Sequence, residues 1–243
     1  MLRRLILGLV IALVVVGGGL GVAVAGGWLL HDSAKPASVS GAVTRLRTSG
    51  ARGAVFVYAT RGTESLNAFV SARHVYPVRT AVTVIATACG KRLTWTALEG
   101  RSTSWTLCRT GKGLELRSEV EVHSFFGRRD RTTYSCKGAL LRPGGGAFRC
   151  HSARGRVDGE MRSLGTEQFT VGGRRLGALH MRETARVAGG DGGRETTDWW
   201  LQPGTGLPLR LAFTSRTSRP LKVGRAHYRE RADLRLVSTG PRR

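Results

Sequence analysis

The stretch LELRSEVEVH (residues 114–123) decides the fold class, because its side chains alternate with a period of two. Its apolar residues all fall on one face: Leu114, Leu116, Val120 and Val122. Its charged residues fall on the other: Glu115, Arg117, Glu119 and Glu121. This alternation predicts a strand with one face in a core and the other in water. We therefore expect Glu119 and Glu121 at the surface, in ion pairs with Arg117 and the basic run 128–134.

Strand signals continue on both sides of this stretch. Runs rich in β-branched and aromatic residues cover 55–58, 81–85, 93–96, 168–171, 176–187, 196–202, 207–214 and 222–237. Turn signals separate them at Pro143-Gly144, Gly172-Gly173 and 203–206. A short helix is expected at 42–47, and no long amphipathic helix is evident after residue 75. The sequence thus predicts a mainly β protein with a meandering antiparallel sheet.

The four cysteines allow three disulfide pairings. Cys136 and Cys150 flank a Pro-Gly turn at their midpoint, and Cys89 and Cys108 flank residues 98–101 near theirs. Directly opposed residues of an antiparallel pair come close enough to be bridged, so we predict Cys89–Cys108 and Cys136–Cys150. The alternative is four free thiols in a cytosolic protein. No spacing is CxxC, which disfavours a zinc site or a redox-active dithiol.

The first thirty residues indicate export. No charged residue occurs from Leu5 to Leu30, which is long enough for one transmembrane helix. Arg3 and Arg4 precede the run, which places the N-terminus in the cytoplasm and the main domain outside the cell membrane. Alternatively, 23–25 is a signal-peptidase site, and cleavage after Ala25 would secrete the domain.

The predicted organisation therefore has four parts. Residues 1–30 form the anchor or signal segment, and residues 31–50 form a juxtamembrane spacer rich in small residues. Residues 51–238 form an extracytoplasmic β domain, and residues 239–243 form a basic tail.

The segment TTDWWLQPGTGLPLRLAF (196–213) resembles a hairpin of the periplasmic lipoprotein-carrier superfamily, which also includes envelope-stress regulators. The resemblance spans about residues 166–216 and rests on Trp200-Leu201 and the run 206–210, with Gln202 in place of the usual Asp. It implies a strongly curved sheet, a half-barrel, whose concave side receives an acyl chain or a peptide segment.

Charge provides a second line of inference. The chain has 39 Lys+Arg against 16 Asp+Glu, a net charge of +23. On the last strand Arg225, Arg229 and Arg231 share one face, which makes them candidate anion contacts. An exported domain is not expected to meet nucleic acid, so the expected anions are lipid headgroups or cell-wall polymers.

No motif argues for catalysis or a cofactor. The six histidines lack metal-ligand spacing, and there is no Walker loop, GxSxG or dinucleotide motif. We therefore expect neither enzyme activity, nor a cofactor, nor a metal. The expected function is binding of a lipid, lipoprotein or other apolar envelope ligand. The alternative is a regulatory or structural module that binds a protein or an anionic polymer through its arginine-rich face.

Overall fold

The computed structural model describes residues 32–190 and 192–242. The expected transmembrane or signal segment, residues 1–30, lies outside the described residues. Within the described part, no helix is both long and apolar enough to cross a membrane.

The described chain consists of one helix followed by fourteen strands. The helix α3 spans Val39–Thr48. The first seven strands are β1 (Gly53–Asn67), β2 (Ser71–Val75), β3 (Arg79–Thr87), β4 (Gly90–Leu98), β5 (Arg101–Thr110), β6 (Gly113–Phe125) and β7 (Arg128–Lys137). The others are β8 (Leu140–Leu141), β9 (Gly146–Ser152), β10 (Gly155–Val171), β11 (Arg174–Gly189), β12 (Gly192–Leu201), β13 (Pro208–Pro220) and β14 (Arg225–Leu236).

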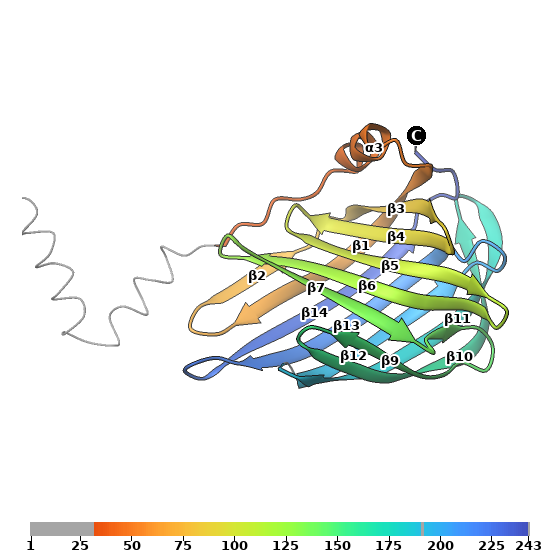
Figure 1. Ribbon diagram of the computed structural model, residues 1–243. Coiled ribbons are helices and arrows are strands. Elements are labelled where there is room, and N and C mark those ends of the chain that lie inside the picture. Colours follow the sequence, from red (N-terminus) through yellow and green to blue (C-terminus); the bar gives the residue numbers. More distant parts are fainter. Residues whose placement is uncertain (1–31, 191, 243) are drawn as a thin grey trace, which may run out of the picture.

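These strands close into an antiparallel barrel (Figure 1). Most strands pair with their neighbours in sequence, and β14 pairs with β1 from Tyr58↔Leu236 to Asn67↔His227. Twelve strands form the ring, while β2 pairs with the second half of β1, beyond the part that pairs with β3, and β8 pairs with β6. The prediction of a mainly β, antiparallel fold is confirmed, and the half-barrel is wrong. Alternation within each strand is the same in an open and a closed sheet, so it could not reveal the β14–β1 seam.

Aromatic side chains fill much of the barrel interior. Trp95, Trp105 and Trp199 are each at most 4% exposed. Trp105 and Trp199 meet edge to face with ring centroids 5.3 Å apart. Large buried rings of this kind supply much of the apolar area that stabilises a core.

The helix α3 covers the outer face of β1 and β3. Its apolar residues Val39, Val43 and Leu46 follow helical spacing and pack on Val55 and Ala81. The Ser38 side chain caps its first turn by accepting a hydrogen bond from the Gly41 backbone N–H at 2.9 Å. This helix includes the expected residues 42–47 and starts three residues earlier.

A β-bulge reverses the faces of β6 midway along the strand. Leu107 of β5 pairs with Leu116, but Thr106 pairs with Ser118, so Arg117 is an extra residue. Beyond this point Glu119, Glu121 and His123 point into the barrel. The expectation that Glu119 and Glu121 lie on the surface is therefore wrong.

Candidate functional site

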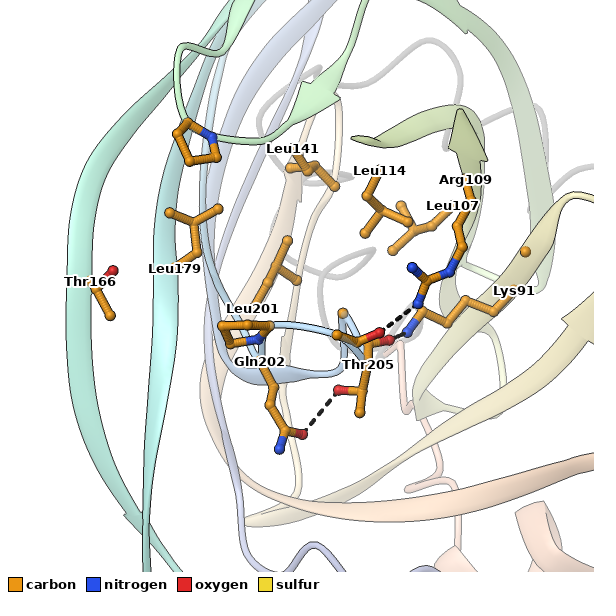
Figure 2. Close-up of a pocket in the computed structure, with 15 residues that line it drawn as sticks. Lys91, Leu107, Arg109, Leu114, Leu141, Thr166, Leu179, Leu201, Gln202 and Thr205 are labelled. Carbon is orange, nitrogen blue, oxygen red and sulfur yellow. Dashed lines mark hydrogen bonds between the residues drawn. The ribbon is translucent and has the colours of Figure 1, made fainter. Parts of the chain in front are cut away.

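An apolar pocket lies at one end of the barrel (Figure 2). Its volume is about 530 Å³, within the range of small-molecule sites. Its walls are formed by leucines from five different strands and by Pro143: Leu107, Leu114, Leu141, Leu179 and Leu201. These strands form two groups that are far apart in sequence, β5, β6 and β8 in one and β11 and β12 in the other, so the pocket has no local sequence motif.

Two cations stand at the edge of the pocket. Lys91 of β4 donates a hydrogen bond to the backbone carbonyl of Thr205, and Arg109 of β5 donates to that of Gly204 (Figure 2). Burial, with the nearby Arg109 charge, lowers the pKa of Lys91 to about 8. An anion placed here would offset the repulsion between the two cations.

The turn between β12 and β13 closes this edge. Gly204 and Gly206 have φ values of +74° and +60°, a region that favours glycine. A Cβ on Gly206 would lie 3.0 Å from Leu114 Cδ2 and 3.3 Å from Lys91 Nζ. The Thr205 hydroxyl donates to Gln202 Oε1 at 2.9 Å. The turn that carries the family resemblance thus forms one wall of the pocket.

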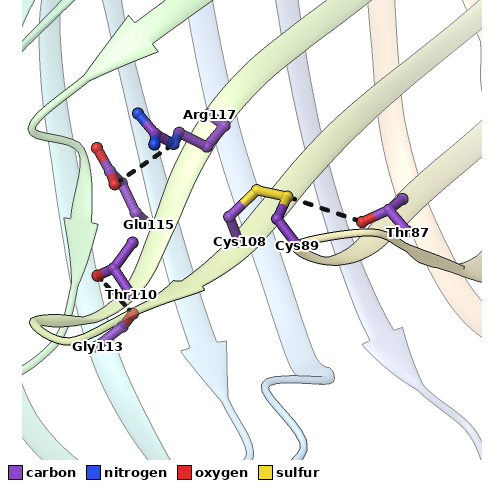
Figure 3. Close-up of a disulfide and its surroundings, with 7 residues drawn as sticks. All are labelled: Thr87, Cys89, Cys108, Thr110, Gly113, Glu115 and Arg117. Carbon is purple, nitrogen blue, oxygen red and sulfur yellow. Dashed lines mark hydrogen bonds and ion pairs between the residues drawn. A yellow bond between two sulfur atoms is a disulfide. The ribbon is translucent and has the colours of Figure 1, made fainter.

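Both predicted disulfides are confirmed. Cys89–Cys108 links β5 to the turn before β4 (Figure 3). Lys91 and Arg109 follow these two cysteines closely in sequence, on β4 and β5. Cys136 and Cys150 are directly opposed on β7 and β9. The first bridge therefore fixes the strand ends at the pocket edge, and the second lies in the core.

A network of charged groups occupies the barrel interior away from the pocket. Arg101, 1% exposed, donates to both carboxylate oxygens of Glu230, at 2.9 Å and 2.7 Å. Glu64 is fully buried and contacts His74 at 2.9 Å and His123 at 3.3 Å. Burial raises the pKa of Glu64, but hydrogen bonds from the two histidines and the Arg101 charge outweigh it and lower the pKa to about 2. These groups form a compensated structural network.

Three other interior carboxylates form no ion pair with an arginine of the described residues 32–190 and 192–242. Burial raises the pKa of Glu183 to about 7, and burial together with the Glu121 charge raises that of Glu195 to about 8. Burial and the same neighbour also raise the pKa of Glu119, which accepts a 2.8 Å hydrogen bond from Trp105 Nε1. Among the residues that the structure describes, no group of three or more His, Cys, Asp or Glu side chains is arranged to hold a metal ion.

The candidate anion contacts lie on the outer face of β14, the strand whose inner face carries Glu230 of the buried network. Arg225, Arg229 and Arg231 are all exposed. Arg225 donates to Ser218 Oγ at 2.9 Å. Their role as anion contacts remains a prediction.

The pocket was missed by sequence reasoning because its residues are scattered from Gly90 to Gly206. The inward position of Glu119 and Glu121 was missed because of the bulge in β6. Of the segments that line the pocket, the turn 202–206 was predicted from sequence, through its Pro-Gly turn signal.

Comparison with known proteins does not identify a family for this chain. No protein-family model and no curated protein match the chain. Among solved structures, the fold is similar to that of the hypothetical lipoprotein YmcC from Escherichia coli (K12), with 11% identity and a TM-score of 0.32 over 75% of this chain and 86% of that one. This likeness is too low to carry an argument about function, and the half-barrel superfamily is not confirmed.

Proposed function

We propose that this protein is a non-catalytic, extracytoplasmic binder of a single-chain amphiphile with an anionic head group. The pocket at the barrel end is the observation that carries the proposal. Leucine walls suit an acyl chain, because burying each CH₂ group contributes about 0.8 kcal/mol. Lys91 and Arg109 at the edge suit a carboxylate or phosphate head. The ligand would lie at the end of a closed barrel rather than on the concave side of an open sheet.

The proposed location rests on the disulfides and on the sequence of residues 1–30. Two disulfides account for all four cysteines of the chain. Disulfides form and persist mainly in oxidising compartments. An envelope location would also give the protein access to lipids.

The binding test compares oleate with oleyl alcohol, which has the same chain without the charge. Oleate should bind with micromolar or better affinity, measured by displacement of a fluorescent fatty acid. The alcohol should bind more weakly. Oleate affinity should fall as the pH rises through about 8, because Lys91 loses its proton and with it the attraction for the carboxylate. If neither compound binds, the proposal is wrong.

A pair of variants tests whether the ligand occupies the pocket. Leu179→Arg puts a bulky charge into the pocket and should weaken oleate binding at least about tenfold. Leu164→Arg makes the same change on β10 at a side chain that is 47% exposed and does not line the pocket. It should leave binding unchanged. Equal effects of both variants would place the ligand elsewhere, and thermal unfolding checks that each variant is folded.

A further inference from the structure

Four arginines stand side by side on four adjacent strands. Arg186 of β11 is directly opposite Arg194 of β12, and Arg194 is directly opposite Arg216 of β13. Arg216 in turn is directly opposite Arg229 of β14. All four are exposed on the outer face of the barrel. We call this set the arginine row.

The arginine row is not neutralised by the protein. Within the described part of the chain, none of its four members forms an ion pair. Asp158 stands opposite Arg186 on β10, but its ion pairs go to Arg149 at 2.5 Å and Arg156 at 2.8 Å. Like charges directly opposed across strands are destabilising. The row therefore repels itself in the free protein.

A nearby row on the same strands shows the opposite arrangement. This second row lies four residues away from the arginine row along each strand. In it, Arg182 of β11 is directly opposite Asp198 of β12 and forms an ion pair with it at 2.8 Å. In the same row, Asp233 of β14 accepts from Arg210 at 2.8 Å. The β13 position of this row is Ala212, and both of its aspartates are paired with an arginine, so these strands do carry compensated charge. The absence of acids from the arginine row is thus a local feature and not only a result of the overall charge.

We propose that the arginine row binds a linear polyanion with repeated phosphate groups, laid across the strands. Neighbouring strands lie about 4.8 Å apart, so the row presents four guanidinium groups over about 14 Å. Guanidinium groups match phosphate oxygens in a bidentate manner. The outer face of a closed barrel is convex, and a flexible chain can follow that curvature whereas a flat membrane meets only part of it. This surface is separate from the pocket.

Inorganic polyphosphate is the probe, with orthophosphate as its monomeric control. Arg194→Ser/Arg216→Ser removes the centre of the row. Arg79→Ser/Arg92→Ser is the matched control, because it removes the same charge from two exposed arginines on β3 and β4. Binding is measured by titration calorimetry at several salt concentrations.

The row variant should bind polyphosphate about tenfold more weakly at low salt, and the control variant less than twofold. The slope of log affinity against log salt should become shallower by about 1.4, since each phosphate contact to a flexible strand contributes about 0.7. The row variant should also unfold at an equal or higher temperature at low salt, because like-charge repulsion is relieved. That result separates lost binding from lost folding.

Three outcomes would overturn the proposal. Equal losses from both variants would mean that only net charge matters. Equal affinity for orthophosphate and polyphosphate would mean that the row does not recognise a polymer. Tighter binding to phosphatidylglycerol vesicles than to polyphosphate would make a membrane surface the partner.

Discussion

Arg101 is the charged residue on which the interior of the barrel depends. Its guanidinium is bonded at two points to Glu230, lies 3.6 Å from Glu64 and donates to Thr103 Oγ1 at 2.7 Å. Removing one partner of a buried pair leaves the other charge uncompensated, which costs far more than the pair contributes.

Replacing Arg101 by Met should lower the free energy of unfolding by about 3–5 kcal/mol, measured by urea denaturation. Arg182→Met breaks the exposed pair with Asp198 and should cost at most about 1 kcal/mol. Adding Glu230→Leu to Arg101→Met should recover part of the loss. Equal costs for the two single variants would contradict this account of the interior.

Glu183 and Glu195 should make the protein less stable as the pH rises. Their pKa values, about 7 and about 8, lie above those of an unfolded chain, so the folded state binds more protons between pH 5 and pH 9. Because one pKa unit corresponds to about 1.4 kcal/mol, the free energy of unfolding should therefore fall by at most about 7 kcal/mol across this range. His123, with a pKa raised to about 9, adds to the same trend above pH 6.5.

Glu183→Gln/Glu195→Gln should flatten this pH profile, as measured by urea denaturation at each pH. Glu160→Gln is the control, because that carboxylate is exposed and paired with Arg162. A double variant with an unchanged profile would show that these two carboxyls titrate normally.

At the scale of single elements, β6 shows what its sequence could and could not predict. Alternation correctly indicated a strand and correctly placed Leu114 and Leu116 toward the interior. The bulge at Arg117 adds one residue, so the inward face changes from leucines to glutamates. Nothing in LELRSEVEVH distinguishes a bulged from a regular strand. The cysteine pairs, in contrast, were predictable because their turn signals lie at the midpoints.

The two disulfides should differ in how easily they are reduced. Cys89 is exposed, whereas Cys136 and Cys150 are 2% and 5% exposed. Dithiothreitol should therefore reduce Cys89–Cys108 first, as mapped by alkylation and mass spectrometry. Cys136→Ser/Cys150→Ser should lower the free energy of unfolding by about 3 kcal/mol, the value for loops of this length. Simultaneous reduction of both bridges would show that exposure does not control access.

At the scale of the whole molecule, the acidic and basic residues are segregated. Glutamates such as Glu64, Glu119 and Glu230 point inward, whereas most arginines cover the outside. The sequence predicted a basic exterior through its net charge of +23 but gave no sign of an acidic interior. The half-barrel expectation failed at the same scale, because closure is a property of two strands far apart in the chain.

Salt should stabilise the protein, because it screens repulsion among the outer arginines. Raising NaCl from 10 mM to 150 mM should increase the melting temperature by a few degrees, and sodium phosphate should increase it more than NaCl at equal ionic strength. Differential scanning calorimetry measures both. A melting temperature that falls with salt would mean that attractive surface ion pairs dominate.

The seam between β14 and β1 makes completion of the barrel depend on the last of its strands. The strand β14 (Arg225–Leu236) is synthesised after the other thirteen described strands, yet it supplies the partner for residues 58–67 of the first one. Until it arrives, one border of the sheet stays open and able to pair with another copy. Truncation before residue 225 should therefore yield aggregates instead of a smaller folded domain, and refolding should be slow because this contact spans most of the chain.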